Sequence, residues 1–170
     1  MALKSTDKFA NKFYGTATET GAATLTFSEI KTSVDVFSKQ AWILHRLEWY
    51  ISAADIEKLV AAGDYIEAAL TATDKISALG LGDAGVIDLF QLQNHFATAV
   101  GYTVHQKPFI RDFTGMPGGG LIIAPRPLYV AVKGTSLASA VSALCRGYFT
   151  NLAMSADEYL ELVDFYRIVQ

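Results

Sequence analysis

The sequence has one cysteine, four prolines and little charge, and these shortages narrow what the protein can be. Cys145 has no second cysteine in the chain, so an internal disulfide is excluded. Only 18% of the residues are charged, whereas roughly a quarter are charged in typical soluble domains. A chain of 170 residues with so little charge has difficulty covering its surface with polar groups. Burial of that surface in an assembly is one solution.

No stretch of the sequence is apolar for long enough to span a membrane. The longest stretch without a formal charge, residues 89–106, is interrupted by glutamine, asparagine and histidine, and a span needs roughly 18 consecutive apolar residues. Residues 1–8 are mostly polar, so we expect no signal peptide. The net charge of −3 provides no overall basic field that would condense nucleic acid.

Short runs of alternating apolar and polar residues predict strands along most of the chain. The most β-prone run is 120–132, where Pro125 and Pro127 each remove a ladder donor and therefore predict strand, corner, strand. The run 41–51 alternates strongly and carries bulky side chains on both faces. Further strands are predicted within 24–37, 64–79, 86–93, 102–113 and 140–150.

Two short helices are predicted from their capping residues. Ser52 fits the N-cap position ahead of an apolar helical stripe. Ser155 and Glu158 form a capping box for a C-terminal helix, on which we expect Leu160 and Val163 to be buried.

Together these elements indicate an all-β protein with two short helices. Helix never alternates regularly with strand, which argues against βαβ units. About eight antiparallel strands in two sheets form a single jelly-roll β-sandwich, which we expect over residues 24–170. Residues 1–23 contain small polar residues without periodicity, so we expect an N-terminal arm.

Strict alternation over 41–51 places Trp42 and Trp49 on opposite faces of one strand. Exposed tryptophans form stacking platforms for sugars, whereas buried ones fill a core or an interface. We favour packing, and keep sugar stacking as the alternative.

Gly134-Thr135-Ser136 resembles the nucleophile motif of subtilisin-like serine proteases, with Ser136 as the nucleophile. That chemistry needs a histidine base and an orienting aspartate. The surroundings of His45, His95 and His105 do not fit the histidine motif of that family. We therefore interpret the segment as a turn between two strands and expect no enzymatic activity.

Other chemistry-bearing residues are expected to be structural, so we predict no catalytic, metal or cofactor-binding residues. Cys145 is expected to be a small core residue, and the three histidines form no metal-binding pattern. Gly118–Gly120 lacks the lysine and hydroxyl residue that complete a phosphate-binding loop. A solvated helix face and turn are expected for Asp55, Glu57, Asp64 and Glu67.

The order of these features resembles the small single jelly-roll coat proteins of icosahedral viruses, particularly those of bacteria or archaea. A polar arm is followed by the strand 43–51, the double strand 121–134, and a last strand, 143–150, that leads into the helical segment 152–163. The resemblance implies a structural virion protein that self-assembles into an icosahedral capsid shell and carries no catalytic residues. It implies a location in the virion, and in the host cytoplasm during assembly.

The resemblance also leaves several partners open. Coat proteins that condense RNA usually have a strongly basic arm, whereas this one carries only Lys4, Lys8 and Lys12. We therefore expect at most weak contact of the arm with nucleic acid or an internal membrane, and a second coat protein as an optional partner. The alternative function is a β-sandwich binding module, lectin-like or part of a spike or adhesin. It would use Trp42, Trp49 or the loop 115–120.

Overall fold

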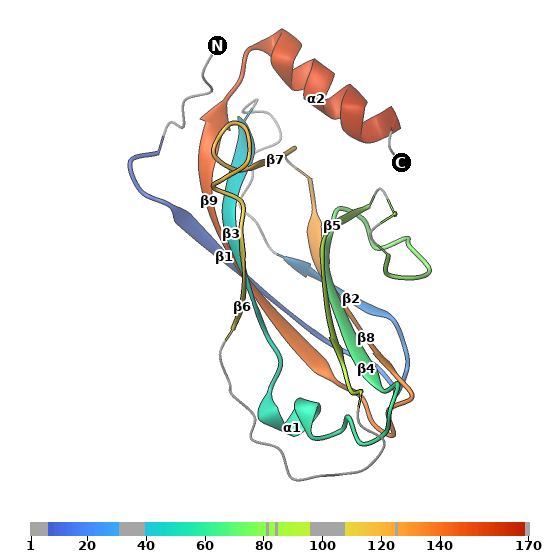
Figure 1. Ribbon diagram of the computed structural model, residues 1–170. Coiled ribbons are helices and arrows are strands. Elements are labelled where there is room, and N and C mark those ends of the chain that lie inside the picture. The colour runs from blue at the N-terminus through green and yellow to red at the C-terminus, as the bar shows by residue number, and fades with distance from the viewer. Residues whose placement is uncertain are drawn as a thin grey trace.

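A computed structural model describes residues 7–30, 40–80, 82–83, 85–95, 108–124 and 126–168, which form two facing antiparallel sheets (Figure 1). Sheet A has the order β1-β9-β3-β6, with β7 also on β3, and sheet B has the order β2-β8-β4-β5. The elements are β1 (Asn11–Thr18), β2 (Thr26–Ile30), β3 (Gln40–Tyr50), α1 (Ala53–Ile56), β4 (Tyr65–Thr71), β5 (Val86–Gln93), β6 (Phe109–Asp112), β7 (Leu121–Ile123), β8 (Leu128–Thr135), β9 (Ser142–Ala153) and α2 (Ala156–Ile168).

The strand pairing is that of a jelly roll. Both β6 and β7 pair with β3, β7 along Trp42–Leu44 and β6 along Arg46–Trp49, so together they act as one interrupted strand. The first strand then pairs with the last, the second with the last but one, and so on inward to β4 with β5. A long hairpin wound around a core produces this pairing. The predicted jelly-roll sandwich is confirmed.

The N-terminal segment differs from the predicted extended or mobile arm. Residues 11–18 form β1, which pairs with β9 along its whole length. Phe13 and Ala17 point into the core, at 6% and 1% exposure. Gly15 lies between them because a Cβ there would meet Ile30 at 2.8 Å. This inward glycine hides the apolar alternation, which is why the strand is missed in the sequence. The boundary at residue 24 stays a prediction.

Strand β3 contains a bulge that breaks the predicted alternation. Leu44 pairs with Phe149 and Arg46 pairs with Tyr148, so His45 is an extra residue without a partner position. A bulge residue reverses which positions face inward. Even-numbered residues before His45 and odd-numbered residues after it therefore line the core. The prediction that Trp42 and Trp49 face opposite ways is wrong.

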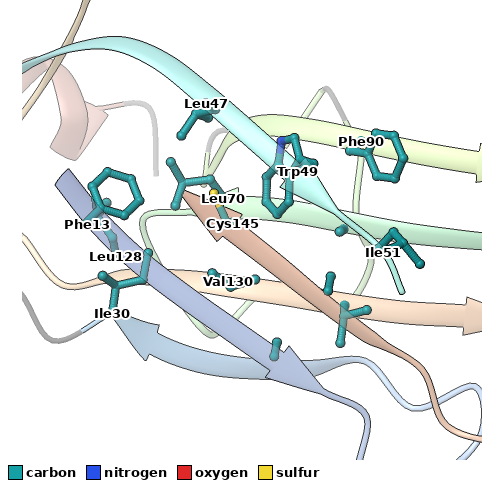
Figure 2. Close-up of a cluster of buried hydrophobic side chains, with 14 of the residues drawn as sticks. Phe13, Ile30, Leu47, Trp49, Ile51, Leu70, Phe90, Leu128, Val130 and Cys145 are labelled. Carbon is teal, nitrogen blue, oxygen red and sulfur yellow. The ribbon is translucent and has the colours of Figure 1, made fainter. Parts of the chain in front are cut away.

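The core fills the space between the two sheets, as Figure 2 shows for one part of it. Trp49 of β3, Leu70 of β4 and Val130 of β8 are fully buried there. Trp42 stacks on Phe149 with ring centroids 4.0 Å apart, and Phe13 lies 6.0 Å from Trp42. Aromatic layers and β-branched side chains from facing strands therefore hold the sheets together.

The two helices begin as predicted. The Ser52 hydroxyl accepts from the Asp55 amide at 3.1 Å, and Ser155 and Glu158 make the reciprocal bonds of a capping box. Leu160, however, is 58% exposed, because α2 uses Leu162 for its contact with sheet A. Val163 lies outside the residues whose side chains are described. Neither described helix has the length and apolar character needed to cross a membrane.

Two predicted segments fall partly outside the described residues. Of the run 24–37 the structure describes β2 and its entry, and residues 31–37 lie outside. Of the run 102–113 it describes the part that contains β6, and residues 102–107 lie outside. The strands predicted at 41–51, 64–79, 86–93, 120–132 and 140–150 are confirmed as β3, β4, β5, the pair β7 and β8, and β9.

Candidate assembly surface

Ser136, the candidate nucleophile, lies in the turn that joins β8 to β9. Its φ of +62° is in the left-handed region, and its side chain is exposed. The neighbouring Leu137 is buried and belongs to the core. The geometry is that of a turn between two strands, as interpreted from the sequence, and it carries the chain from sheet B to sheet A.

His45 uses both ring nitrogens for structural hydrogen bonds. Nδ1 lies 2.9 Å from the Gly119 carbonyl oxygen and Nε2 lies 2.9 Å from the Thr150 hydroxyl. His95 is exposed after β5, and His105 lies outside the described residues. Within the described part of the chain, no group of three or more histidine, cysteine, aspartate or glutamate side chains could hold a metal ion.

Cys145 is fully buried between the sheets. Burial raises the pKa of its thiol far above the ordinary value, so the thiol stays protonated. A protonated, inaccessible thiol is a poor nucleophile. Cys145 is a core residue, as predicted.

Two acidic residues predicted to be solvated are buried instead. Asp64 is 3% exposed, and its carboxylate accepts from the amides of Val60 and Ala61 at 2.9 and 2.7 Å. Asp55 is 7% exposed, and its carboxylate accepts from Lys58 at 2.8 Å. Asp64 thus satisfies two backbone donors of its turn, and Asp55 pairs with a side chain of its own helical turn, so both are structural.

The two tryptophans are unavailable to ligands. Trp42 is 6% exposed and Trp49 is 0% exposed. The Trp49 indole donates to the Asp88 carboxylate of β5 at 2.8 Å, a bond that joins the two sheets. The favoured interpretation, packing, is confirmed, and the sugar-stacking alternative is wrong, because the bulge at His45 turns both rings into the core.

The loop 115–120 is exposed over most of its length. Gly118 and Gly119 adopt positive φ values of 89° and 79°, and Met116 is 44% exposed. Gly120 is buried, and a Cβ there would meet the Leu44 carbonyl oxygen at 2.7 Å. The loop is thus anchored at one end on β3 and presents its tip outward.

Large apolar side chains are exposed at both edges of sheet A. Phe9 precedes the edge strand β1 and is 78% exposed, and Tyr14 on β1 is 57% exposed. At the opposite edge, Phe109 and Ile110 of β6 are 50% and 53% exposed. Leu160 of α2 adds a further exposed side chain. Edge strands with exposed apolar groups are suited to pairing with another chain.

The outer face of sheet A also carries a charged network that sequence reasoning missed. Glu48 is 4% exposed, and its carboxylate binds the guanidinium groups of Arg46 and Arg146. Hydrogen bonding to Glu48 raises the pKa of Arg146. The ring of Tyr148 has the charged groups of Arg46, Arg146 and Lys12 at 5.6 to 5.7 Å. These residues come from three strands, and only their alternation away from the core could have signalled them.

Comparison with known proteins gives structural neighbours only. No protein-family model and no curated protein matches the chain. VP1 of Trichodysplasia spinulosa-associated polyomavirus, solved with GM1 oligosaccharide, aligns with a TM-score of 0.56 at 6% identity, over 91% of this chain and 99% of that one. The unassembled pentamer of Merkel cell polyomavirus VP1 aligns with a TM-score of 0.55 at 6% identity and the same coverage. The chain has the fold of viral capsid proteins.

This fold agrees with the resemblance stated from the sequence. The shared feature is the whole jelly roll, because the alignment extends over nearly all of both chains. The predicted bacterial or archaeal host has no support among these structures, which come from polyomaviruses.

Proposed function

We propose that the protein is a structural, non-enzymatic virion subunit that self-assembles into an icosahedral capsid shell. The observation that supports this proposal most is the jelly-roll pairing of the described strands, shared with the polyomavirus VP1 structures. A sandwich of this kind offers neighbours two sheet edges, two outer faces and two ends with loops.

The surface chemistry supports the same function. Exposed apolar side chains lie on β1 and β6, at opposite edges of sheet A, so a subunit can contact one neighbour on each side. Contacts at two different surfaces generate closed rings or shells, whereas contact through a single self-complementary patch stops at a dimer. The low share of charged residues fits a subunit that buries much of its surface.

The proposed function also implies which partners the protein binds and where it is found. The principal partner is a second copy of the chain, in the virion and in the host cytoplasm during assembly, with a second coat protein as a possible addition. Lys8 and Lys12 place positive charge at the start of β1, which supports weak contact of this region with a genome or an internal membrane. A bacterial or archaeal host stays a prediction.

The test is the mass and shape of the purified full-length protein. We expect multi-megadalton particles by light scattering and closed shells by negative-stain microscopy. Phe9→Lys and Ile110→Lys place charge at the two exposed edges and should lower the yield of particles more than tenfold. Ala78→Lys, on an exposed loop of the other sheet, is the matched control and should assemble normally. A stable monomer of 18.4 kDa under all assembly conditions would contradict the proposal.

The alternative is a sandwich that binds glycans. Its support is that several of the structural neighbours were solved with oligosaccharides, among them GM1 oligosaccharide and 3'-sialyllactose. With both tryptophans buried, the exposed loop 115–120 is the remaining candidate from the sequence. Saturation-transfer NMR with 3'-sialyllactose tests it, and a signal that Met116→Ala abolishes would favour this function.

A further inference from the structure

The outer face of sheet A has a composition unlike the rest of the surface. We call the cluster of Lys12, Tyr14, Arg46, Arg146 and Tyr148 the tyrosine–arginine face. Cross-strand register places it in two rows, Lys12 beside Tyr148 beside Arg46, and Tyr14 beside Arg146. Side chains that point the same way on neighbouring strands form one continuous surface.

This face carries more positive than negative charge, although the whole chain has a net charge of −3. Its three cations are Lys12, Arg46 and Arg146. The facing carboxylates are Glu48, which both arginines share, and Asp112, which lies opposite Arg46 on β6. Asp112 also accepts from the Thr114 hydroxyl at 2.6 Å and keeps its negative charge. The three cations therefore outnumber the two carboxylates by one. An anion that approaches this face is therefore attracted.

The same face offers aromatic rings and a pocket. Tyr14 is 57% exposed on the edge strand. Tyr148 on β9 is half-buried and lies diagonally across from it, beside Lys12. A pocket of about 200 Å³ lies beside Arg146. Its lining residues are Glu48, Tyr50, Pro108, Leu144 and Arg146. Positive groups beside an exposed ring, here that of Tyr14, form the arrangement that binds an unpaired base and its phosphates.

We propose that the tyrosine–arginine face binds single-stranded nucleic acid, with Lys12, Arg46 and Arg146 at phosphates and Tyr14 stacked on a base. This rests on the proposed function and extends the weak genome contact proposed for Lys8 and Lys12 to the outer face of sheet A. It also differs from contact through a mobile arm, because the cations project from paired strands. An acidic peptide would bind only through the positive charge of this face. Such a peptide has no base that could stack on Tyr14.

The experiment is fluorescence anisotropy of the full-length protein with a labelled oligothymidylate of about 16 nucleotides, within the range of single-strand sites. We expect affinity to fall steeply as salt rises. Tyr14→Ala should weaken binding roughly tenfold. Arg146→Gln should weaken binding and lower the slope of log affinity against log salt by about 0.7. In the Arg146→Gln variant, Glu48 still has Arg46 as an ion-pair partner, so we expect this variant to fold.

Lys133→Gln, on the outer face of sheet B, is the matched control and should bind like the wild type. Each variant is also checked for its unfolding temperature and for particle formation, so a loss of assembly is distinguished from a loss of binding. Equal or tighter binding to a duplex of the same length would overturn the stacking role, because a duplex has no free base faces. Full displacement by polyglutamate at equal charge, or affinity unchanged in both variants, would overturn the proposal.

Discussion

The outer faces of the two sheets differ in how much of each is covered by the chain itself. On sheet B the chain covers its own surface, because Leu79 packs on Ala69 of β4 and Ala131 of β8, with Ile76 of the same loop beside them. On sheet A, α2 covers one end through Leu162, and the remainder is the exposed tyrosine–arginine face. Small alanines allow close coverage by the chain, whereas large charged side chains remain available for partners.

The pKa values of one acidic group on each face are shifted in opposite directions. On sheet B, burial raises the pKa of Glu67, and Lys133 opposes this in part. On sheet A, hydrogen bonds from Thr114 lower the pKa of Asp112, with a smaller contribution from Arg46. The covered face therefore disfavours negative charge, and the open face stabilises it.

The largest expected change in stability comes from placing a charge beneath the loop that packs on the outer face of sheet B. Ala131→Asp buries a carboxylate among Ala69, Leu79 and Phe27. Lys133 on the same face already lies opposite Glu67. An unpaired buried charge should lower the free energy of unfolding by on the order of 4 kcal/mol. Urea denaturation measures it. Thr16→Asp, at an exposed position on sheet A, is the control and should change stability by less than about 0.5 kcal/mol. Similar losses in both variants would show that the two faces are not different.

A smaller effect is expected from the network on sheet A. Glu48→Gln removes the negative charge that holds Arg46 and Arg146 together, and both arginines reach solvent, which limits the cost. We expect a loss of about 1 to 2 kcal/mol in the free energy of unfolding, decreasing as salt rises. Binding of oligothymidylate should become tighter in the same variant, since one carboxylate is gone. Weaker binding in a folded variant would argue against positive charge as the cause of affinity.

The smallest effect is the pH dependence of the two carboxylates, with opposite signs. Because the folded-state pKa of Glu67 is raised, its ionisation costs stability as pH rises through that value, and Glu67→Gln should remove this loss. Because the folded-state pKa of Asp112 is lowered, its ionisation adds stability above the unfolded value, and this is lost as pH falls through the folded value. Asp112→Asn should therefore lower the unfolding temperature at pH 7, and the difference from the wild type should shrink as pH falls into the acid range. Shifts of the same sign in both variants would contradict the assignment.

Local signals in the sequence predicted most strands and both helix starts. The prolines that frame the corner between β7 and β8 and the Ser155–Glu158 capping box act through nearest neighbours, so a single sequence contains them. The inward Gly15 and the bulge at His45 depend on strands far along the chain, which is why β1 and the facing of Trp42 were mispredicted. The Glu48 network joins β3 to β9, and no local spacing reveals it.

The bulge at His45 has a consequence for how related sequences should be aligned. The inward pattern changes from even to odd positions at this one residue. A relative that lacks the extra residue can have the same core. Its sequence then aligns with this one only if a gap of one residue is placed at His45. An alignment without that gap would pair the inward Leu47 and Trp49 with outward positions of the relative. Deletion of His45 from this chain would restore regular alternation, with Leu47 and Trp49 still inward and Glu48 outward. It would remove the bonds of the His45 ring to Gly119 and Thr150.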